Sequence, residues 1–468
     1  MNNAVLGIDI GTSALKILYV QNGKILQRSR CSYEEESPEG WWKAFLSALS
    51  DLQDLSSVRA VGFSSQVGTY LINGQHLLPW SSPEGAEYVD RILERYPEED
   101  FIPEIGMPHP RLSSYPLPKL WYAAARYGSV TRVLQPKDLF VQRLTGQCVS
   151  DPYSWRGLAH TASGDTASAQ GSHDTAGITP CTYSRRFLRD AGIDPSALPA
   201  LKMPWETAGR LLPEAAARTG LPAGLPVYTG LNDFYAALLG MGIHGPGCWF
   251  DITGSSEHLG LVEEQLHTGS DLISSPFFSG YVHYGVTASS GVSLSFRKEV
   301  FPCDIRDPRR LLDDAPVFLP YLNGERAPVF DPAARGTFYG ITGKTGAAHM
   351  AYAVQEGVAF SIFHIYSHLG AEGGDSVRVC GGASGNPLLN YLKAELLQKT
   401  ITVIGEKDAS ALGGAVTALL GEGLLSSIRE AAGLAGISEE VRPDGRLRRR
   451  LLERFDIYTA LYRRVRGL

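Results

Sequence analysis

The sequence predicts an α/β protein with two domains that are copies of one fold. At 468 residues the chain is longer than one hydrophobic core usually supports. A strand, a turn of glycine and hydroxyl residues and a returning strand begin the chain, and they occur again where Asp251-Ile252 matches Asp9-Ile10. A proline- and glycine-rich stretch, residues 221–226, separates the copies. We therefore expect one domain over residues 1–228 and a second over 229–468.

The first copy shows its elements clearly. Two apolar runs predict buried strands, and Asn22-Gly23 is a strong signal for a two-residue hairpin leading into a third strand. A helix with aromatic residues on one face follows, and then a fourth strand. These elements are expected at residues 5–10, 14–21, 24–29, 38–52 and 58–64. Strand, strand, strand, helix, strand is the opening of a ribonuclease-H-like domain.

Composition and charge exclude several classes of function. The net charge of −6 gives no support for nucleic-acid or membrane-surface binding. The six cysteines form no C-x-x-C pair, which favours reduced thiols and a cytoplasmic protein. The eleven histidines show no metal-ligand spacing. We see no targeting segment after Met1 and no run long enough to span a membrane.

The first turn carries residues suited to phosphate. Gly11 lets the backbone turn closely, so that amide groups face an anion, and the Thr12 and Ser13 hydroxyls add donors. Asp9 is suited to Mg²⁺, and Lys16 on the returning strand can neutralise phosphate charge. The alternative is a tight hairpin in which Asp9 caps its own turn.

A second acid lies between a strand and a helix. Asn232 and Asp233 precede an alanine-rich run, so either residue is a natural helix N-cap. The functional interpretation of Asp233 is a general base that accepts the proton of an attacking hydroxyl during phosphoryl transfer. Capping and catalysis are compatible.

A glycine-rich corner follows a strand at residues 376–380. Gly381, Gly382 and Ala383 let a flat ligand lie against the backbone, and Asn386 before Pro387 is a helix start whose amide can pair with adenine. A helix of small residues begins at Ser410, and we expect it to pack closely beneath this corner.

With these segments in order, the chain resembles the FGGY carbohydrate kinases, a family in the superfamily of actin, chaperone ATPases and sugar kinases. The resemblance covers nearly the whole chain. Its most specific stretches are residues 321–328, 331–336, 356–360 and 381–386, with Trp41-Trp42 and residues 137–146 in the first half.

The resemblance implies two ribonuclease-H-like domains, a duplicated actin-like ATPase fold, around a central cleft. It implies transfer of the γ-phosphate of ATP, with Mg²⁺, to a hydroxyl of a small sugar or polyol, most simply a ketose. Asp233 is then the general base, and Asp9 and Asp233 are the metal-binding carboxylates. The residues implied to bind ATP and phosphate are Gly11, Thr12, Ser13, Lys16, Thr253, Gly254, Ser255, Gly381, Gly382, Ala383 and Asn386. Our candidates for sugar contacts are Gln66, Trp80, Asn232 and Asp233.

The chain departs from the family pattern in several places. Thr253-Gly254 exchanges the usual order of the second turn, and Glu395 replaces the usual aspartate. Trp80 lacks the acid and arginine that usually follow it, and residues 64–69 match no familiar subfamily. The sugar therefore stays unnamed. The alternatives are a kinase of a non-standard polyol and a nucleotide-binding regulatory protein without turnover. A homodimer is expected on frequency alone.

Overall fold

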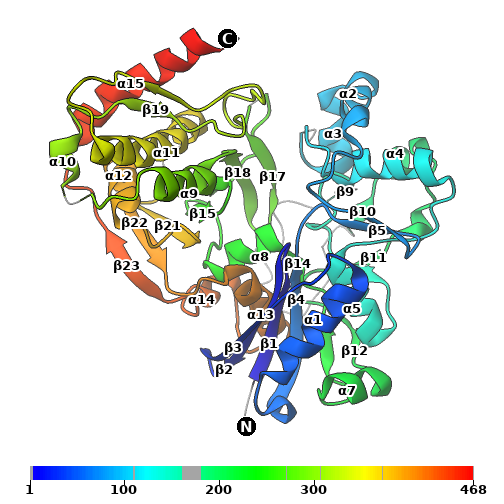
Figure 1. The fold of residues 1–468 in the computed structure, drawn as a ribbon. Coiled ribbons are helices and arrows are strands. Elements are labelled where there is room, and N and C mark those ends of the chain that lie inside the picture. The colour runs from blue at the N-terminus through cyan, green and yellow to red at the C-terminus, as the bar shows by residue number, and fades with distance from the viewer. Residues whose placement is uncertain are drawn as a thin grey trace. The chain divides into compact units, whose positions relative to one another are not determined.

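The computed structural model describes residues 4–108, 111–160, 181–269, 271–305, 307–370 and 373–466. The chain forms two compact units, whose elements are labelled in Figure 1. Unit 1 comprises Met1–Gly245, Ser275–Tyr281 and Asp408–Ala435, and unit 2 comprises Pro246–Ser274, Val282–Lys407 and Gly436–Leu468. The domain boundary expected after residue 228 stays a prediction. The first division between the compact units follows Gly245, and two later segments, residues 275–281 and 408–435, also belong to unit 1.

Unit 1 is built on a seven-stranded mixed sheet in the order β12-β13-β4-β1-β2-β3, with β14 beside β4. β1 pairs with β2 antiparallel and with β4 parallel, which confirms the predicted opening of the fold. Asn22 and Gly23 both have positive φ, 51° and 72°, as the tight turn between β2 and β3 requires. The strands are β1 Ala4–Ile10, β2 Ala14–Gln21, β3 Lys24–Ser32, β4 Val58–Ser65, β12 Thr207–Arg210, β13 Pro226–Tyr228 and β14 Leu231–Asn232.

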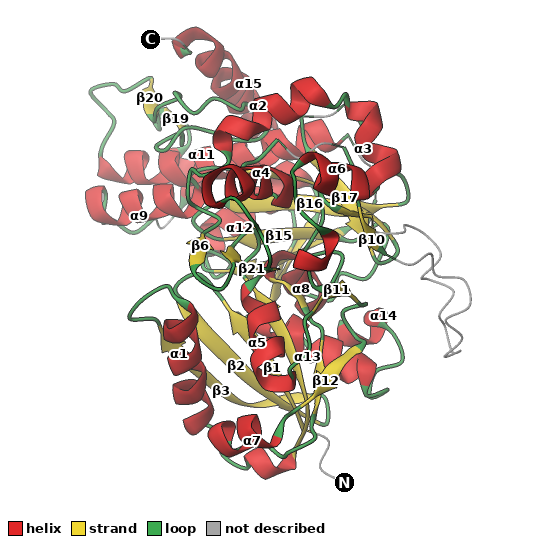
Figure 2. Ribbon diagram, turned by 90° about the vertical axis from the view of Figure 1, so that its right-hand side faces the viewer, coloured by secondary structure: helices red, strands yellow, loops and turns green. Residues whose placement is uncertain are grey.

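Helices cover both faces of this sheet (Figure 2). α1 (Pro38–Ser50) and α5 (Pro136–Thr145) share one core cluster with the side chains of Leu6 and Ile8 in β1. α13 (Ala409–Gly421) packs against β1 and β4 on the other face. There, a Cβ added to Gly7 would lie 2.1 Å from the backbone oxygen of Ala411. Glycine in the strand is therefore what allows this helix to approach so closely.

α13 packs closely through its small residues. The helix that begins near Ser410 contacts β1, β4 and α8 (Asp233–Gly240) of unit 1, whereas the glycine corner belongs to unit 2. A Cβ added to Gly413 would lie 1.8 Å from the backbone oxygen of Ala236 in α8. The predicted close packing is confirmed with these partners, and a place beneath the glycine corner stays a prediction.

Unit 1 also contains short strands and helices beyond this sheet. They are β5 Tyr70–Ile72, β6 His76–Leu78, α2 Ala86–Arg95, α3 Glu98–Ile105, α4 Pro116–Tyr127, β7 Val133–Leu134, β8 Val149–Ser150, β9 Ala159–His160, β10 Thr182–Tyr183, α6 Arg185–Asp190, β11 Ala200–Leu201, α7 Pro213–Thr219 and α14 Ile428–Ala431. A separate core cluster joins several of them, with Tyr96, Phe101, Leu120, Trp155 and Phe187 among its buried members.

A second seven-stranded sheet, in the order β17-β18-β16-β15-β21-β22-β23, repeats the pairing pattern of the first. β15 pairs with β16 antiparallel and with β21 parallel, β22 joins β21 parallel, and β23 ends the sheet antiparallel. The repeat read from Asp9-Ile10 and Asp251-Ile252 is thus a repeat of topology, and the protein is an α/β fold with two mixed sheets in two domains. The strands are β15 Trp249–Thr253, β16 Glu257–Glu263, β17 Ile273–Phe277, β18 Gly280–Val286, β21 Ser376–Gly381, β22 Thr400–Ile404 and β23 Ile437–Val441.

Buried ion pairs and caps hold the helices of unit 2. Arg454 of α15 donates from Nε and Nη2 to the two carboxylate oxygens of buried Glu356 in α11, at 2.8 and 2.6 Å. The carboxylate of Glu395 in α12 accepts four backbone N–H groups at the start of α15, those of Asp444, Gly445, Leu447 and Arg448. Glu395 is therefore a helix cap. The other elements are α9 Ser290–Val300, α10 Pro308–Leu311, β19 Val317–Leu319, β20 Thr337–Tyr339, α11 Ala347–Leu369, α12 Pro387–Leu397 and α15 Arg448–Val465.

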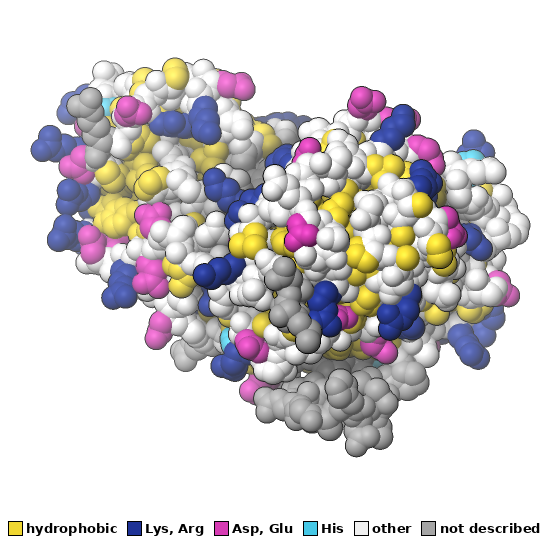
Figure 3. Space-filling model, turned by 90° about the horizontal axis from the view of Figure 1, so that it is seen from below, with side chains coloured by type: hydrophobic (Ala, Val, Ile, Leu, Met, Phe, Trp, Pro, Cys, Tyr) yellow, Lys and Arg dark blue, Asp and Glu magenta, His cyan; other side chains and the backbone are white. Residues whose placement is uncertain are grey.

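Charged side chains of both signs are interspersed over the face drawn in Figure 3. None of the helices in the described ranges is long and apolar enough to cross a membrane.

Candidate functional site

The first glycine turn of unit 1 begins beside a buried carboxylate. Asp9 is 2% exposed at the end of β1, and its Oδ1 accepts a hydrogen bond of 2.7 Å from Ser64 Oγ in β4. Lys16 Nζ lies 3.5 Å from Asp9 Oδ2 and 3.3 Å from Asp408 Oδ1. Burial raises the pKa of Asp9, while the Lys16 charge and the Ser64 hydrogen bond oppose that rise. Asp408 was not foreseen, because it lies almost 400 residues away in the chain and reaches Lys16 only through the return of α13 to unit 1.

Hydroxyl groups and an indole meet at this turn. Gly11 N–H donates to Ala14 O at 3.2 Å, which closes the turn and leaves Thr12 and Ser13 exposed. Trp80 Nε1–H donates to Thr12 Oγ1 at 3.2 Å, and the Trp80 side chain is 38% exposed. The Trp80 side chain therefore lies against the turn and is not part of the hydrophobic core.

Lys119 holds the loop that presents Trp80. Its buried ammonium donates to Pro79 O at 3.1 Å, Ser82 O at 3.1 Å and Ser82 Oγ at 2.8 Å. Burial lowers the pKa of Lys119 to about 8. Sequence reasoning missed this residue, because a single lysine in an apolar helix start carries no signal of what it contacts.

Of the Asx pair, Asn232 is the helix cap, and the catalytic role expected of Asp233 stays a prediction. Asn232 is the N-cap of α8, since its Oδ1 accepts from Tyr235 N–H at 3.0 Å, and its Nδ2 donates to Tyr153 O at 3.0 Å. The Asn232 amide is thus bonded at both ends within the fold, and its contact with a sugar stays a prediction. Asp233 is the first helical residue and is left partly exposed.

The electrostatic setting of Asp233 suits proton transfer. Its Oδ1 accepts backbone hydrogen bonds from Val67 at 3.2 Å and Phe234 at 2.9 Å. Desolvation and then the negative charge of Asp9 raise the pKa of Asp233 to about 7, against the lowering effect of these hydrogen bonds and of Arg156. A carboxyl group with a pKa near neutrality can accept and release a proton at working pH.

Gln66 immediately precedes Val67, whose backbone N–H donates to Asp233. Its backbone N–H donates to Ile10 O at 3.0 Å, and its Nε2 donates to Glu36 Oε1 at 3.0 Å. Within the described part of the chain, the buried Gln66 Oε1 has no hydrogen-bond donor. A buried acceptor without a donor is costly, so a ligand hydroxyl would be favoured there. Glu36 contacts Gln66 as well, and nothing in the sequence predicted this contact.

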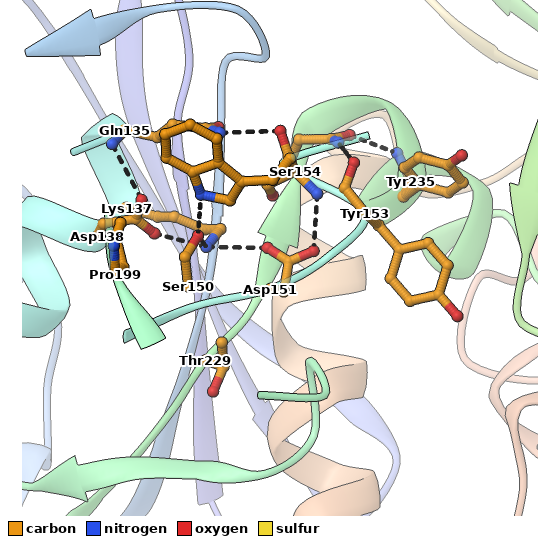
Figure 4. A network of polar contacts seen from close by, with 12 residues as sticks. Gln135, Lys137, Asp138, Ser150, Asp151, Tyr153, Ser154, Pro199, Thr229 and Tyr235 are labelled. Carbon is orange, nitrogen blue, oxygen red and sulfur yellow. Dashed lines mark hydrogen bonds and ion pairs between the residues drawn. The ribbon is translucent and has the colours of Figure 1, made fainter. Parts of the chain in front are cut away.

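A buried polar network centred on Lys137 joins α5 to the loop that carries Tyr153 (Figure 4). Lys137 Nζ lies 2.7 Å from Asp138 Oδ1 and 2.9 Å from Asp151 Oδ2, and all three side chains are fully buried. Asp151 Oδ1 accepts from Ser154 N–H at 2.9 Å. These contacts fix the loop whose Tyr153 carbonyl accepts a hydrogen bond from Asn232 Nδ2. The network therefore helps to hold Asn232, the cap that immediately precedes Asp233.

The same loop carries a buried cation. The Arg156 guanidinium carbon lies 5.5 Å from the ring centroid of Tyr115, 5.1 Å from that of Phe234 and 5.2 Å from that of Tyr235. Aromatic faces stabilise a guanidinium that has left water. Arg156 was not among the predicted site residues.

In unit 2, the second turn and the glycine corner are joined through Thr253. Thr253 Oγ1 donates to Cys380 O at 2.9 Å and accepts from Ala383 N–H at 3.0 Å, while Thr253 O accepts from Gly382 N–H at 2.9 Å. Gly254 and Ser255 are exposed beyond it. The exchanged Thr253-Gly254 order therefore places a hydroxyl in the fold and a bare glycine in the turn.

The corner itself is open backbone. Gly381 has φ +99°, and a Cβ there would lie 2.0 Å from Thr253 O, so this site requires glycine. Nothing lies within 4 Å of a Cβ added at Gly382. Asn386 caps α12 through Leu389 N–H at 3.2 Å, and its Nδ2 donates to Gln355 at 2.7 Å. The predicted cap is confirmed, and its contact with adenine stays a prediction.

Asp251, which matches Asp9 in the repeat, has a different environment. It is fully buried with Lys393, whose Nζ lies 2.6 Å from Asp251 Oδ2 and also contacts Glu257. Desolvation and the Glu257 charge raise the pKa of Asp251, and the Lys393 charge opposes that rise. This ion cluster belongs to the core of unit 2.

The structure therefore gathers the predicted residues into two groups. Unit 1 brings together Asp9, Gly11, Thr12, Ser13, Lys16, Gln66, Trp80, Asn232 and Asp233. Unit 2 brings together Thr253, Gly254, Ser255, Gly381, Gly382, Ala383 and Asn386.

Comparison with known proteins identifies the family. The models for the N-terminal and C-terminal domains of the "FGGY family of carbohydrate kinases" match residues 4–240 and 306–422. A xylulose kinase of Bacillus subtilis is 28% identical and aligns over 92% of this chain and 90% of its own length. A gluconokinase of the same species is 24% identical over 93% of this chain and 91% of its own.

Solved structures share the fold over their whole length. A gluconate kinase from Lactobacillus acidophilus has a TM-score of 0.85 at 20% identity and covers 100% of this chain and 99% of its own. A ligand-bound xylulose kinase from the same species has a TM-score of 0.84 at 19% identity, with 99% of each chain covered. Kinases of this family use ATP as the phosphoryl donor. The chain belongs to the FGGY family and is a carbohydrate kinase.

Proposed function

We propose that this protein transfers the γ-phosphate of ATP to a hydroxyl of a small sugar, sugar acid or polyol, with Asp233 as the general base. The observation that carries the proposal is the setting of Asp233. It combines a pKa of about 7, partial exposure at a helix N-terminus, and a hydrogen bond that ties it to the strand end bearing Gln66 and Val67.

The residues of unit 1 fit Mg²⁺. Asp9 and Asp233 lie close enough for the charge of Asp9 to raise the pKa of Asp233. Paired carboxylate oxygens are the ligands that Mg²⁺ prefers, and a divalent cation would relieve their repulsion. Asp9 and Asp233 would hold the ion, which supplies neutralisation of phosphate charge when bound.

The chain's own groups would then act by positioning and charge. The substrate hydroxyl transfers its proton to Asp233 as its oxygen bonds to phosphorus and the bond to the ADP oxygen breaks. Lys16, Thr12 and Ser13 face phosphate oxygens. In unit 2, Gly254 and Ser255 receive phosphate, and the Gly381–Ala383 corner receives the adenosine. Gln66 Oε1 accepts from a sugar hydroxyl, and Trp80 lies against the sugar ring.

Two substrate classes compete. Alignment with xylulose kinases over nine-tenths of their length favours a ketose. The gluconokinase relative and the buried Arg156 guanidinium, which packs on Phe234 and Tyr235 beside Asp233, favour a sugar acid whose carboxylate Arg156 attracts.

The first test is ADP release from Mg-ATP across ketoses, aldoses, alditols and sugar acids. With the best substrate, Asp233→Asn should lower kcat by about two to four powers of ten while the Kd for ATP changes little. Asp90→Asn, an exposed acid on α2, is the matched control. Near-normal turnover by Asp233→Asn would refute its role as base. Silence for every sugar with intact ATP binding would favour the regulatory alternative.

The two substrate classes are separated by Arg156→Met, compared with Arg156→Lys. For an acid substrate, Arg156→Met should raise KM by about tenfold or more, and Arg156→Lys should restore part of that loss. A neutral ketose should show no such difference between the two variants. Equal effects on neutral and acidic sugars would exclude a carboxylate contact.

A further inference from the structure

Three side chains of types that can bind a metal ion lie together in unit 2, at and after the end of β16 and in the neighbouring strand β18. Glu263 is the last residue of β16, His267 lies in the loop that follows, and His283 lies in β18. β15 ends, and β16 begins, at the turn that carries Gly254. Glu263 is at the other end of β16, so it lies at the end of the strands opposite to this turn. The cluster is therefore separate from the phosphate-binding residues proposed above.

The geometry of the cluster is compact. His267 Nε2 lies 2.7 Å from Glu263 Oε2. The rings of His267 and His283 have centroids 4.4 Å apart and stand almost perpendicular, at 82°. One ligand atom from each of the three residues lies within 4.8 Å of the other two. The loop is anchored nearby, because His267 N–H donates to Ser274 Oγ at 3.2 Å.

His283 supplies the second, independent observation. Its side chain is 2% exposed, and neither ring nitrogen has a hydrogen-bond partner among the described residues. Two unmatched polar atoms in a buried imidazole carry a desolvation cost that the fold itself leaves uncompensated. The two ring nitrogens of His283 therefore have bonding capacity that the described residues leave unused, and they lie beside the His267 ring.

We propose that Glu263, His267 and His283 form a binding site for Zn²⁺ or a similar divalent transition-metal ion. Two imidazoles and one carboxylate are a donor set that zinc accepts, with a fourth position left for water. Imidazole nitrogens select such ions over Mg²⁺, which prefers oxygen. The site is thus distinct in chemistry from the Mg²⁺ of the kinase reaction and does not depend on the proposed substrate.

Binding would tie the loop after β16 to β18. The ion would take the place of the direct contact between Glu263 and His267, with the Glu263 carboxylate and one nitrogen of each ring as its ligands. The sequence hid this site. Glu263 and His267 are four residues apart, and the third ligand arrives sixteen residues later on the neighbouring strand.

The test measures zinc binding to the full chain, produced without a histidine tag and stripped with a chelator. Calorimetric titration with ZnCl₂ gives the affinity, and Co²⁺ substitution gives a visible spectrum that reports tetrahedral nitrogen and oxygen ligands. The variants are His267→Ala, His283→Gln and Glu263→Gln. The control is His368→Ala, because exposed His368 lies next to half-buried His364 on α11, with ring centroids 5.0 Å apart, and this pair can collect metal adventitiously.

We expect one tight zinc site, lost by more than about 100-fold in His267→Ala and His283→Gln and unchanged in His368→Ala. That loss exceeds the 10- to 100-fold typical of an outer-shell partner. Zinc should also raise the Tm of the parent chain and leave that of His267→Ala unaltered. If His283→Gln does not fold, partly exposed His267 and Glu263 still decide the matter. Equal affinity in parent and His267→Ala, or loss of binding only in His368→Ala, would overturn the proposal.

Discussion

Asp9 and Asp233 are both aspartates at the ends of buried elements in unit 1, and their partners set them apart. Asp9 has Lys16 and the Ser64 hydroxyl within reach, which stabilise its ionised form. Asp233 accepts hydrogen bonds from two backbone N–H groups, and the negative charge of Asp9 opposes its ionisation. A base that must take up a proton benefits from the second environment, and a permanent anion benefits from the first.

The pH dependence of turnover follows from Asp233. Because the carboxylate form is the base and burial raises the pKa of Asp233 in the free chain to about 7, kcat/KM for the sugar should rise with pH through about 7 and then level. One unit below that midpoint kcat/KM should be on the order of tenfold lower. The measurement is kcat/KM for the sugar from pH 5.5 to 8.5 with Mg-ATP below saturation.

A variant tests the electrostatic account of this profile. The Arg156 charge favours the ionised form of Asp233, so Arg156→Met should move the midpoint to higher pH. A midpoint near 4 in the parent chain, or no displacement in the variant, would contradict the account.

At the scale of elements, α13 is the helix on which unit 1 depends most. It packs on β1 and β4 through Gly7 and Gly62, and on α8 through Gly413. A Cβ at Gly62 would lie 2.0 Å from Gly414 O, so backbone meets backbone on both sides of the helix. Such contacts leave no flexible side chain to move aside.

Gly413→Ala should therefore destabilise the protein by about 1–3 kcal/mol or more, as overpacking does. The free energy of unfolding from urea denaturation measures this loss. Gly433→Ala is the control, since its Cβ would meet only Glu430 O at 3.6 Å. Equal stability of the two variants would show that α13 can shift without cost.

At the scale of the whole molecule, each compact unit is assembled from distant parts of the sequence. Unit 1 needs residues 408–435 to cover the face of its sheet that α1 and α5 leave open. It also takes Ser275–Tyr281, where Ser275 lies 2.6 Å from the Tyr235 hydroxyl. A cut at the predicted boundary after residue 228 would separate residues 408–435 from strands β1 and β4, which α13 covers.

A fragment of residues 1–245 should consequently fail to fold cooperatively, because the α13 face of β1 and β4 is exposed to water. We expect dye binding typical of exposed apolar surface and a broad thermal transition. Residues 1–245 joined by a flexible linker to 408–435 should recover a sharp transition. A well-folded 1–245 fragment would show that α13 is dispensable.

Much of the local chemistry could be read from the sequence. The hairpin at Asn22-Gly23, the caps at Asn232 and Asn386 and the strand before Gly381 are properties of neighbouring residues, and the structure confirms each. The repeat and the family also follow from patterns along the chain, because a duplicated fold keeps its turns in order.

Only the tertiary structure decided the contacts between residues that are far apart in the sequence. Asp408 beside Lys16, Lys119 under the Trp80 loop, Glu36 on Gln66 and His283 beside His267 have no local signal. The raised pKa of Asp233 is of the same kind, because burial and the charge of Asp9 exist only once β1 and α8 are packed together. By itself the sequence determined the opening strands of the fold, the hairpin turn and the helix caps, since backbone propensities act between near neighbours. Partners and pKa values depend on which distant surfaces exclude water from one another, and that is a property of the folded chain.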